Sequence, residues 1–261
     1  MAKRLYIVSS GAGGTSYITP EATKAIENSE VIVSYSKYAR ELKELLKEKE
    51  VYTSGMTHEI QRCNQAIQYA KSGKTTSIIS NGDVNVYGMA TLIVEIMDEK
   101  DLWDEIELIS LPGVTSFLAA ASKAGAPVSQ DFSIISLSDR LTDINLIDKR
   151  VKAALECDFV LGIYNPKSKK RIKPYQNFLK ALENGYENRI AIIASNVGRV
   201  EKEKITITTA QDLINQDIEH EAVSMSTLII ICNSNSKLTK NNQVLTPRGY
   251  LNKYELDGEL K

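Results

Sequence analysis

The sequence predicts an α/β protein with two α/β lobes and a ligand cleft between them. Short apolar stretches alternate with longer stretches whose apolar residues recur at helical spacing. Glycine, proline, asparagine and aspartate mark the turns between them. With 261 residues, of which 43% are hydrophobic, the chain is long enough to bury a substantial core. Alternation of this kind is typical of sheets whose strands are mostly parallel.

The first lobe is expected to span residues 1–114. A buried strand at residues 4–10 leads through a glycine loop to a helix at 21–30, for which Thr19 supplies the N-cap and Pro20 the first-turn proline. The elements that follow are a strand at 31–35, helices at 37–48 and 58–73, a third strand at 75–80, a helix at 86–97, a strand at 106–111 and a small-residue helix within 112–125.

The second lobe is expected to span residues 115–240, with Gly125-Ala126-Pro127 as a hinge. Its strands are predicted at 132–138, 159–165, 189–195, 204–208 and 227–233, and its helices at 145–156 and 174–185. Residues 241–261 are polar and are expected to form a partly ordered tail.

Composition excludes several classes of protein. The 32 basic and 33 acidic residues give a net charge of -1, so no overall field attracts nucleic acid or an anionic membrane. The three cysteines have no C-x-x-C spacing and there are only two histidines, so no metal site is predicted. Because no apolar run reaches the roughly 20 residues of a membrane span and no signal peptide is seen, a cytoplasmic protein is expected.

Small and polar residues follow several predicted strands. The segments are Gly11–Ser16, Asn81–Asp83, Pro112–Ser116, Ser136–Asp139 and Tyr164–Pro166. Ligands of parallel α/β sheets bind at the carboxyl ends of the strands, so these segments predict a binding site. The first loop fits a dinucleotide fingerprint poorly, because Ser16 stands at the third glycine position and the second strand ends in Tyr35 instead of an acid. A tight turn without a ligand is the alternative for that loop taken alone.

Taken together, the motifs GAG, GDVNVYGMA, PGVTS, DFSIISLSDRLT, IYNPKSKKR and TPRGY resemble the tetrapyrrole methylases of cobalamin biosynthesis over nearly the whole chain. Within that family the chain is most similar to the branch that methylates carbon 17 of precorrin-3B or cobalt-factor III. The resemblance implies a cofactor cleft that holds S-adenosylmethionine, a tetrapyrrole substrate with or without cobalt, and a homodimer.

The resemblance also implies site residues. Those assigned to the cofactor are Gly11, Gly13, Gly14, Asn81, Gly82, Asp83, Val86, Tyr87, Thr115, Ser116, Tyr164, Asn165, Ser195 and Thr227. Asp83 places an anion near a cationic sulfonium, and a helix N-cap is the alternative role for this residue.

Catalytic roles are expected for Tyr35, Asp83 and Asp139, with Glu59 as a further acid-base candidate. The substrate carries many carboxyl groups, so Tyr38, Arg62, Arg140 and Arg171 are assigned to it. A tyrosine titrates near 10, which suits a hydrogen-bond donor better than a base.

Three segments depart from the family pattern. Gly14-Thr15 replaces proline-glycine, Val84-Asn85 replaces proline-glycine, and Asp143-Ile144 replaces proline-tryptophan. Two other functions therefore stay open. The chain is either a methylase of the same superfamily with another target, or a non-catalytic protein that carries the tetrapyrrole or the cofactor.

Overall fold

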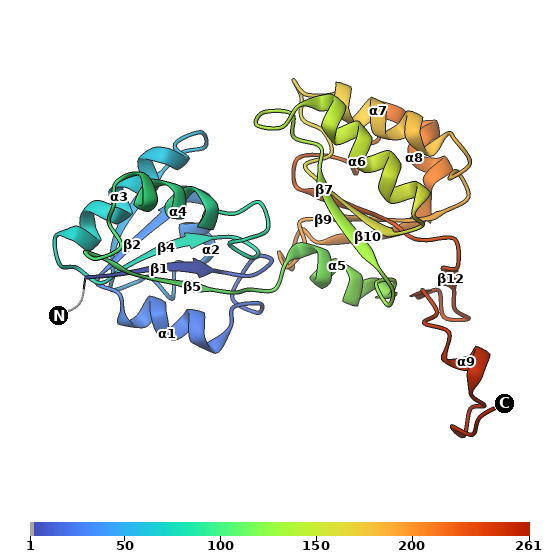
Figure 1. Cartoon of the computed structure of the whole chain (residues 1–261), viewed down its shortest axis with the longest axis horizontal. Helices are drawn as coiled ribbons and strands as arrows, with labels where there is room; N and C mark the ends of the chain where they lie inside the picture. Colours follow the sequence, from blue (N-terminus) through green and yellow to red (C-terminus); the bar gives the residue numbers. More distant parts are fainter. Residues whose placement is uncertain (1–2) are drawn as a thin grey trace. The chain divides into compact units, whose positions relative to one another are not determined.

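The computed structural model describes residues 3–261 and divides them into two compact units (Figure 1). Unit 1 comprises the described residues up to Ser116 together with Gly198–Val200. Unit 2 comprises Phe117–Val197 and Glu201–Lys261. Both units contain a five-stranded sheet with helices packed on it, which confirms the predicted α/β class. Among residues 3–261, no helix has the length and apolar composition needed to cross a bilayer.

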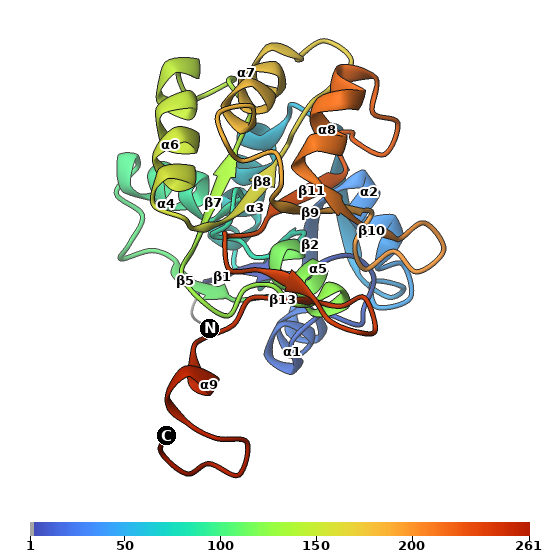
Figure 2. The same ribbon diagram turned by 90° about the vertical axis from the view of Figure 1, so that its right-hand side faces the viewer.

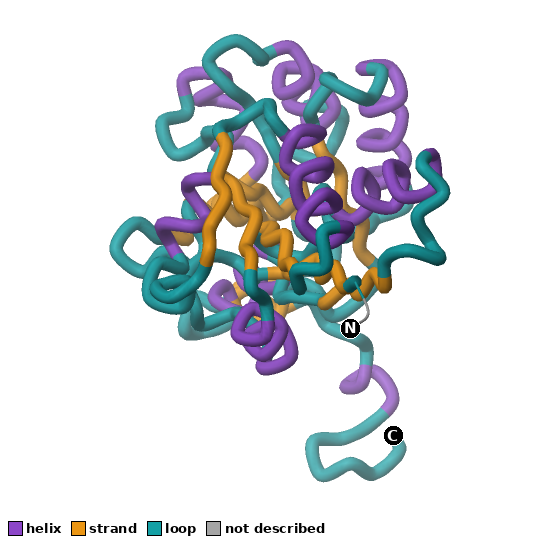
Figure 3. Tube along the Cα trace, turned by 90° about the vertical axis from the view of Figure 1, so that its left-hand side faces the viewer, coloured by secondary structure: helices purple, strands orange, loops and turns teal. Residues whose placement is uncertain are grey.

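Unit 1 is built on a parallel sheet with the strand order β3-β2-β4-β1-β5. The strands are β1 (Arg4–Ser9), β2 (Val31–Tyr35), β3 (Glu50–Ser54), β4 (Thr76–Ser80) and β5 (Glu107–Leu111). The helices are α1 (Pro20–Asn28), α2 (Ser36–Glu41), α3 (Glu59–Lys71) and α4 (Ala90–Glu99). Figure 3 shows helices on both sides of these strands.

Alternate residues of the unit 1 strands pack into two cores. Leu5 and Ile7 of β1 face the layer formed by α3 and α4. Tyr6 and Val8 face the layer that contains α1. A strand buried on both faces reads as a continuous apolar run, and the sequence of β1 shows such a run. Thr19 caps α1 as predicted, because its hydroxyl accepts a hydrogen bond from Ala22 N.

Unit 2 contains a mixed sheet with the order β10-β9-β11-β8-β7. Its strands are β7 (Phe132–Ser136), β8 (Val160–Tyr164), β9 (Ile190–Ser195), β10 (Lys204–Thr209) and β11 (Thr227–Ile231). Strands β7 and β8 are parallel, whereas β11 runs antiparallel to β8 and β9, and β10 antiparallel to β9.

Helices cover both faces of the unit 2 sheet (Figure 2). One face packs on α6 (Ile144–Glu156), α7 (Lys173–Leu182) and α8 (Ala210–Gln216), which is followed by the 3-10 turn η1 (Asp217–Glu219). The other face meets α5 (Ser116–Ala124), whose Phe117 ring lies directly against Gly162. A side chain at position 162 would collide with that ring, so the glycine is required by packing.

The C-terminal segment contains short strands and one short helix. Strands β12 (Lys237–Leu238) and β13 (Val244–Leu245) form a small sheet with β6 (Gly125–Ala126). The predicted hinge at Gly125 is therefore part of a strand in unit 2. Thr246 is fully buried, and its hydroxyl bonds to Pro127 O at 2.6 Å. The short helix α9 (Tyr250–Lys253) follows and projects away from the sheets of unit 2 (Figures 1 and 2).

Three other predictions about elements were wrong. Strand β3 was not predicted, so the stretch at 75–80 is the fourth strand of the chain and not the third. The helix predicted at 37–48 ends at Glu41 and continues as turns. The helix predicted to begin at residue 86 begins at Ala90, because residues 84–88 form a tight loop in which Ala90 N donates to Val84 O.

Candidate functional site

The carboxyl ends of the five parallel strands of unit 1 meet at one edge of the sheet, where the backbone of two loops pairs directly. Gly11 N donates to Gly82 O at 3.1 Å, and Gly82 N donates to Gly11 O at 2.7 Å. The amide of Asn81 adds a hydrogen bond to Gly11 O at 2.7 Å. Two segments that lie 70 residues apart in the sequence are thereby held as one surface.

Asp83 joins a third loop to this pair. One of its carboxylate oxygens accepts from Asn85 N at 2.8 Å, and the other accepts from Gly113 N at 2.9 Å. The alternative role as a helix N-cap is wrong, because the residue before α4 is Met89 and no side chain caps that helix. Asp83 therefore fixes the loop after β4 against the loop after β5, and its negative charge stays at the strand edge.

The glycines of this edge differ in what surrounds them. A Cβ at Gly11 would lie 2.3 Å from Tyr17 O, and a Cβ at Gly113 would lie 2.6 Å from Gly82 O. Packing requires both residues to lack a side chain. Gly82 has φ +74°, but a Cβ there would meet no atom within 4 Å. The space beside Gly82 is open, as expected of a position that a ligand approaches closely.

The first loop has its own conformation. Gly13 and Gly14 have φ values of +94° and +60°. Proline is restricted to φ near -65°, so the proline found here in the family could not adopt this backbone. Gly14 lies next to Gly198, whose own Cβ position is blocked by Ala12 O at 1.8 Å. Gly14 therefore suits the backbone of this loop, whereas a proline at this position would not.

The loop after Asp83 holds an aromatic residue in an unusual conformation. Tyr87 has φ +55°, and its side chain is exposed. Val86 N donates to Asp83 O, and Gly88 is needed because a Cβ there would lie 2.5 Å from Val84 O. A non-glycine residue in the left-handed region costs of the order of 1 kcal/mol and is enriched at functional sites.

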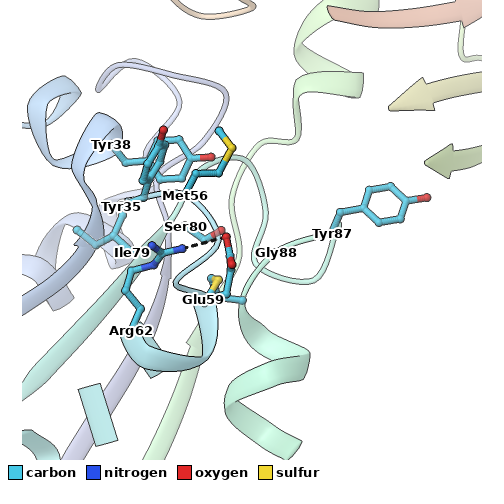
Figure 4. Close-up of a pocket in the computed structure, with 10 residues that line it drawn as sticks. Tyr35, Tyr38, Met56, Glu59, Arg62, Ile79, Ser80, Tyr87 and Gly88 are labelled. Atoms are coloured by element: carbon cyan, nitrogen blue, oxygen red, sulfur yellow. Dashed lines mark hydrogen bonds and ion pairs between the residues drawn. The ribbon is translucent and has the colours of Figure 1, made fainter. Parts of the chain in front are cut away.

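A pocket of about 190 Å³, which we call the Tyr35 pocket, opens beside these loops at the ends of β2, β3 and β4. Figure 4 shows Tyr35, Tyr38 and Met56 gathered on one side of it, while Tyr87 points away. The rings of Tyr35 and Tyr38 meet edge to face with centroids 5.1 Å apart. Burial raises the pKa of Tyr38, so its hydroxyl stays protonated and available as a donor.

Arg62 and Glu59 are the charged residues that line this pocket, and Arg62 is the buried one. It is 5% exposed and lies over the Tyr35 ring at 5.8 Å. Its guanidinium donates to Ser54 Oγ at 2.9 Å and to Gly55 O at 2.8 Å, and it pairs with Glu59 at 3.4 Å (Figure 4). The structure therefore brings together Tyr35, Tyr38, Arg62 and Glu59, all of which the sequence assigned to the substrate or to proton transfer.

The predicted site residues of unit 2 lie at one end of its strands. Ser136 pairs with Tyr164 in the ladder, and Thr227 pairs with Ser195. The Ser195 hydroxyl donates to Ala222 O and lies 3.2 Å from that of Thr227. Asn165 has φ +51°, and its amide donates to Ser136 Oγ at 3.0 Å. Side chains hold these loops together.

Arg171 holds that edge most extensively. Its guanidinium donates to Leu137 O at 2.5 Å and to Asn165 O at 2.8 Å, and it lies 3.9 Å from Asp139. Because this guanidinium is 11% exposed and bonded to the backbone, its observed contacts are structural. Arg140 is exposed. The sequence did not indicate this difference, because Leu137 is 34 residues away from Arg171.

Thr115 directly precedes α5, and Ser116 is its first residue. The sequence did not single out Ser54 or Met56, both of which belong to the Tyr35 pocket or its arginine. Because strand β3 was not predicted, nothing in the sequence placed these two residues near the site. The assignments of all these residues to cofactor, substrate or catalysis stay predictions.

The fold and the loops at its strand edges define a family. The model of the tetrapyrrole (corrin/porphyrin) methylases matches residues 4–214. The chain belongs to this family.

Relatives and a solved structure agree with this assignment. The chain is 40% identical to a probable cobalt-factor III C(17)-methyltransferase of Methanocaldococcus jannaschii, over 97% of this chain and 100% of that protein. It is 35% identical to a cobalt-factor III methyltransferase of Priestia megaterium over 98% of this chain, but it spans 47% of that relative, about half its length. The crystal structure of the methyltransferase CobJ superposes with a TM-score of 0.83 at 28% identity and covers 93% of this chain and 99% of CobJ.

Proposed function

We propose that this protein is an S-adenosylmethionine-dependent C-methyltransferase of cobalamin biosynthesis. It transfers a methyl group to carbon 17 of cobalt-factor III or precorrin-3B, and ring contraction accompanies the transfer. The observation that carries the proposal is the convergence of the family's glycine and aspartate motifs on one strand edge of unit 1, in a chain similar to C(17)-methyltransferases over nearly its full length.

The residues of this edge fit the cofactor. S-adenosylmethionine, when bound, supplies an electrophilic methyl group on a cationic sulfonium. Gly82 leaves open space beside the loop, and Asp83 provides a fixed anion next to it. A nearby anion stabilises a cation, and more so where water is partly excluded. Val86 and Tyr87 continue the same loop. Tyr164, Asn165, Ser195 and Thr227 of unit 2 stay predicted cofactor contacts.

Methyl transfer to carbon requires orientation and a dry site more than a nucleophilic side chain. The Tyr35 pocket supplies hydroxyl groups and a buried guanidinium whose position is fixed by Ser54 and Gly55. Because the raised pKa of Tyr38 keeps its proton in place, we assign this hydroxyl to hydrogen bonding with the substrate. Tyr35, Asp83 and Asp139 remain the candidates for moving the acceptor proton.

The reaction is tested by anaerobic incubation with cobalt-factor III and isotopically labelled S-adenosylmethionine, followed by mass spectrometry and carbon NMR. The label is expected at carbon 17. A label on another ring carbon would move the protein to a different target within the family. Bound cofactor without any transferred label would favour the carrier function.

Placement of the cofactor is tested separately by calorimetry. Gly82→Val is expected to abolish binding of S-adenosylmethionine, because the new methyl groups fill the open space. Gly73→Val is the matched control, since Gly73 also has a positive φ and open surroundings but follows α3. Equal cofactor affinity in the two variants would contradict the placement. We also propose that the protein is a cytoplasmic homodimer.

A further inference from the structure

Unit 2 contains a cavity that is distinct from the Tyr35 pocket. Its volume is about 680 Å³, and it lies where the segments after β7 and β8 approach the segment before β11. Four basic residues line it, namely Arg140, Lys167, Lys169 and Lys170, together with one acid, Glu219. We call it the basic cavity. A local excess of positive charge is notable in a chain whose net charge is -1.

The basic residues of this region fall into two groups. Lys167 Nζ donates to Ile218 O and, at 3.1 Å, to His220 O, and burial lowers its pKa. Arg171 is likewise bonded to backbone carbonyls. Lys167 therefore forms part of the cavity wall, whereas Arg171, which does not line the cavity, holds the segment next to it.

Arg140, Lys169 and Lys170 are different, because all three are exposed. Within residues 3–261 none of them has a hydrogen bond or an ion pair. Three cations therefore lie at the rim of the basic cavity without a compensating anion in contact.

The rest of the lining consists of three serines, Ser168, Ser224 and Ser226, and four apolar side chains. Ile172, Ile218, Val223 and Met225 contribute hydrocarbon and thioether groups to the cavity. A small inorganic anion makes no use of such a surface. A ligand with an apolar body and several acidic groups on its periphery fits better. Its apolar body packs against these residues, and its acidic groups pair with the cations at the rim.

We propose that the basic cavity binds carboxylate side chains of the tetrapyrrole, with Arg140, Lys169 and Lys170 as the residues that contact them. This inference rests on the proposed function and names a part of the substrate and the side chains that select it. Arg171 becomes a positioning residue that shapes the segment carrying the two lysines. The inference thus replaces Arg171 by Lys169 and Lys170 among the predicted substrate contacts.

The test uses uroporphyrin III, a polycarboxylate porphyrin, as the probe, and measures its binding through its fluorescence at low salt. The variant R140Q/K169Q/K170Q removes the three rim charges. The matched control R150Q/K152Q/K180Q removes one arginine and two lysines that are exposed on α6 and α7 of the same unit. Exposed ion pairs contribute roughly two- to fivefold each, so the rim variant is expected to bind about tenfold or more weakly.

Two further readouts make the result specific. Affinity of the wild type is expected to fall as salt rises, and this dependence is expected to flatten in the rim variant alone. Coproporphyrin III, which carries fewer carboxyl groups, is expected to bind the wild type more weakly than uroporphyrin III, with a smaller difference in the rim variant.

Calorimetry with S-adenosylmethionine separates this inference from the proposed function. Retained cofactor affinity with lost porphyrin affinity supports the inference. Retained affinity for both ligands overturns it and leaves the proposed function intact. Equal losses of porphyrin affinity in the rim and control variants also overturn the inference. Loss of cofactor affinity in the rim variant overturns it too, because that result would assign the basic cavity to the cofactor. A wild type that binds no cofactor refutes the proposed function itself.

Discussion

In the two units, the loops at the strand ends that carry the predicted site residues are held together by different kinds of interaction. In unit 1, Gly11 and Gly82 pair backbone to backbone, and Gly113 fits against them because it has no side chain. In unit 2, the guanidinium of Arg171 and the hydroxyls of Ser195 and Thr227 bridge the loops. Backbone pairing leaves the space beside Gly82 free of side chains and open to a close ligand, although Asn81 and Asp83 add side-chain bonds nearby. In unit 2, the loops depend mainly on bridging side chains.

The comparison predicts which substitutions are severe. Adding atoms should damage the unit 1 edge, whereas removing atoms should damage the unit 2 edge. The predictions that follow test this contrast, from the largest expected effect to the smallest.

Gly11→Ala is expected to lower the free energy of unfolding by roughly 2 to 5 kcal/mol. Its Cβ would lie 2.3 Å from Tyr17 O in a backbone with φ +72°, so overpacking adds to the strain of the left-handed region. Its bonding partner Gly82 is the control. Gly82→Ala meets no atom and is expected to cost only the backbone strain, about 1 to 2 kcal/mol. Urea denaturation measures both, and equal losses would remove the distinction between the two glycines.

Arg171→Gln is expected to cost about 2 to 3 kcal/mol, because Leu137 O and Asn165 O lose a charged donor in a region that excludes water. Arg140→Gln, at the neighbouring exposed arginine, is expected to stay within about 0.5 kcal/mol. Thermal unfolding of the two variants checks the difference. A tolerated loss of Arg171 would mean that its bonds do not hold the edge.

Asp83→Asn is expected to cost about 1 kcal/mol, because the amide keeps only one acceptor oxygen for Asn85 N and Gly113 N. It should also weaken binding of S-adenosylmethionine, since the anion is lost. Asp139→Asn is the counterpart in unit 2, where the carboxylate lies 3.9 Å from Arg171, and its effect on stability should stay below about 0.5 kcal/mol. Calorimetry and urea denaturation are measured on both variants. Weaker cofactor binding in neither variant would count against an electrostatic role for Asp83.

The last expected effect is absent at neutral pH: it is a fall in stability at alkaline pH, to which the two units should contribute equally. Burial raises the pKa of Cys63 in unit 1 and of Cys232 in unit 2 from 9.0 to about 12. The unfolded chain loses these protons above pH 9, whereas the folded chain keeps them, so stability is complete below pH 9 and declines as pH rises towards 12.

Each buried thiol is expected to account for about 1 kcal/mol of this loss by pH 10. Cys63→Ala or Cys232→Ala should each flatten the decline between pH 8 and pH 10, whatever the alanine itself costs. Cys157→Ala, at the exposed cysteine, should leave the slope unchanged. Urea denaturation at several pH values gives the slopes.

The sequence predicted the fold well where burial on both sides produced a continuous apolar run, as in β1 and β8. It missed β3, whose residues are mostly exposed at the edge of the sheet and whose apolar signal is therefore weak. The predicted helix at 37–48 contains Leu42 and Leu46, which are buried although the helix stops before them. The sequence pattern did not determine where the backbone leaves the helix.

For the candidate site, glycines and aspartate at strand ends could be found from the sequence, because turn chemistry is local. The partners of Asp83 and Arg171 could not, since each bonds to backbone groups about 30 residues away. Those distant partners decide whether a charged residue stabilises a loop or is available to bind a ligand. On that distinction we propose Arg171 as a positioning residue and Lys169 and Lys170 as substrate contacts.

Unit 1 is completed by Gly198–Val200, a segment that follows most of unit 2 in the sequence. Within unit 1, Gly198 packs against Ala12, and Arg199 forms an ion pair with Glu41 at 2.7 Å. During translation, the first 116 residues are synthesised more than 80 residues before the segment Gly198–Val200. The first loop therefore cannot make its contact with Gly198 until much of unit 2 has been synthesised. A stop codon placed after residue 116 would release a sheet that lacks the segment closing its glycine loop.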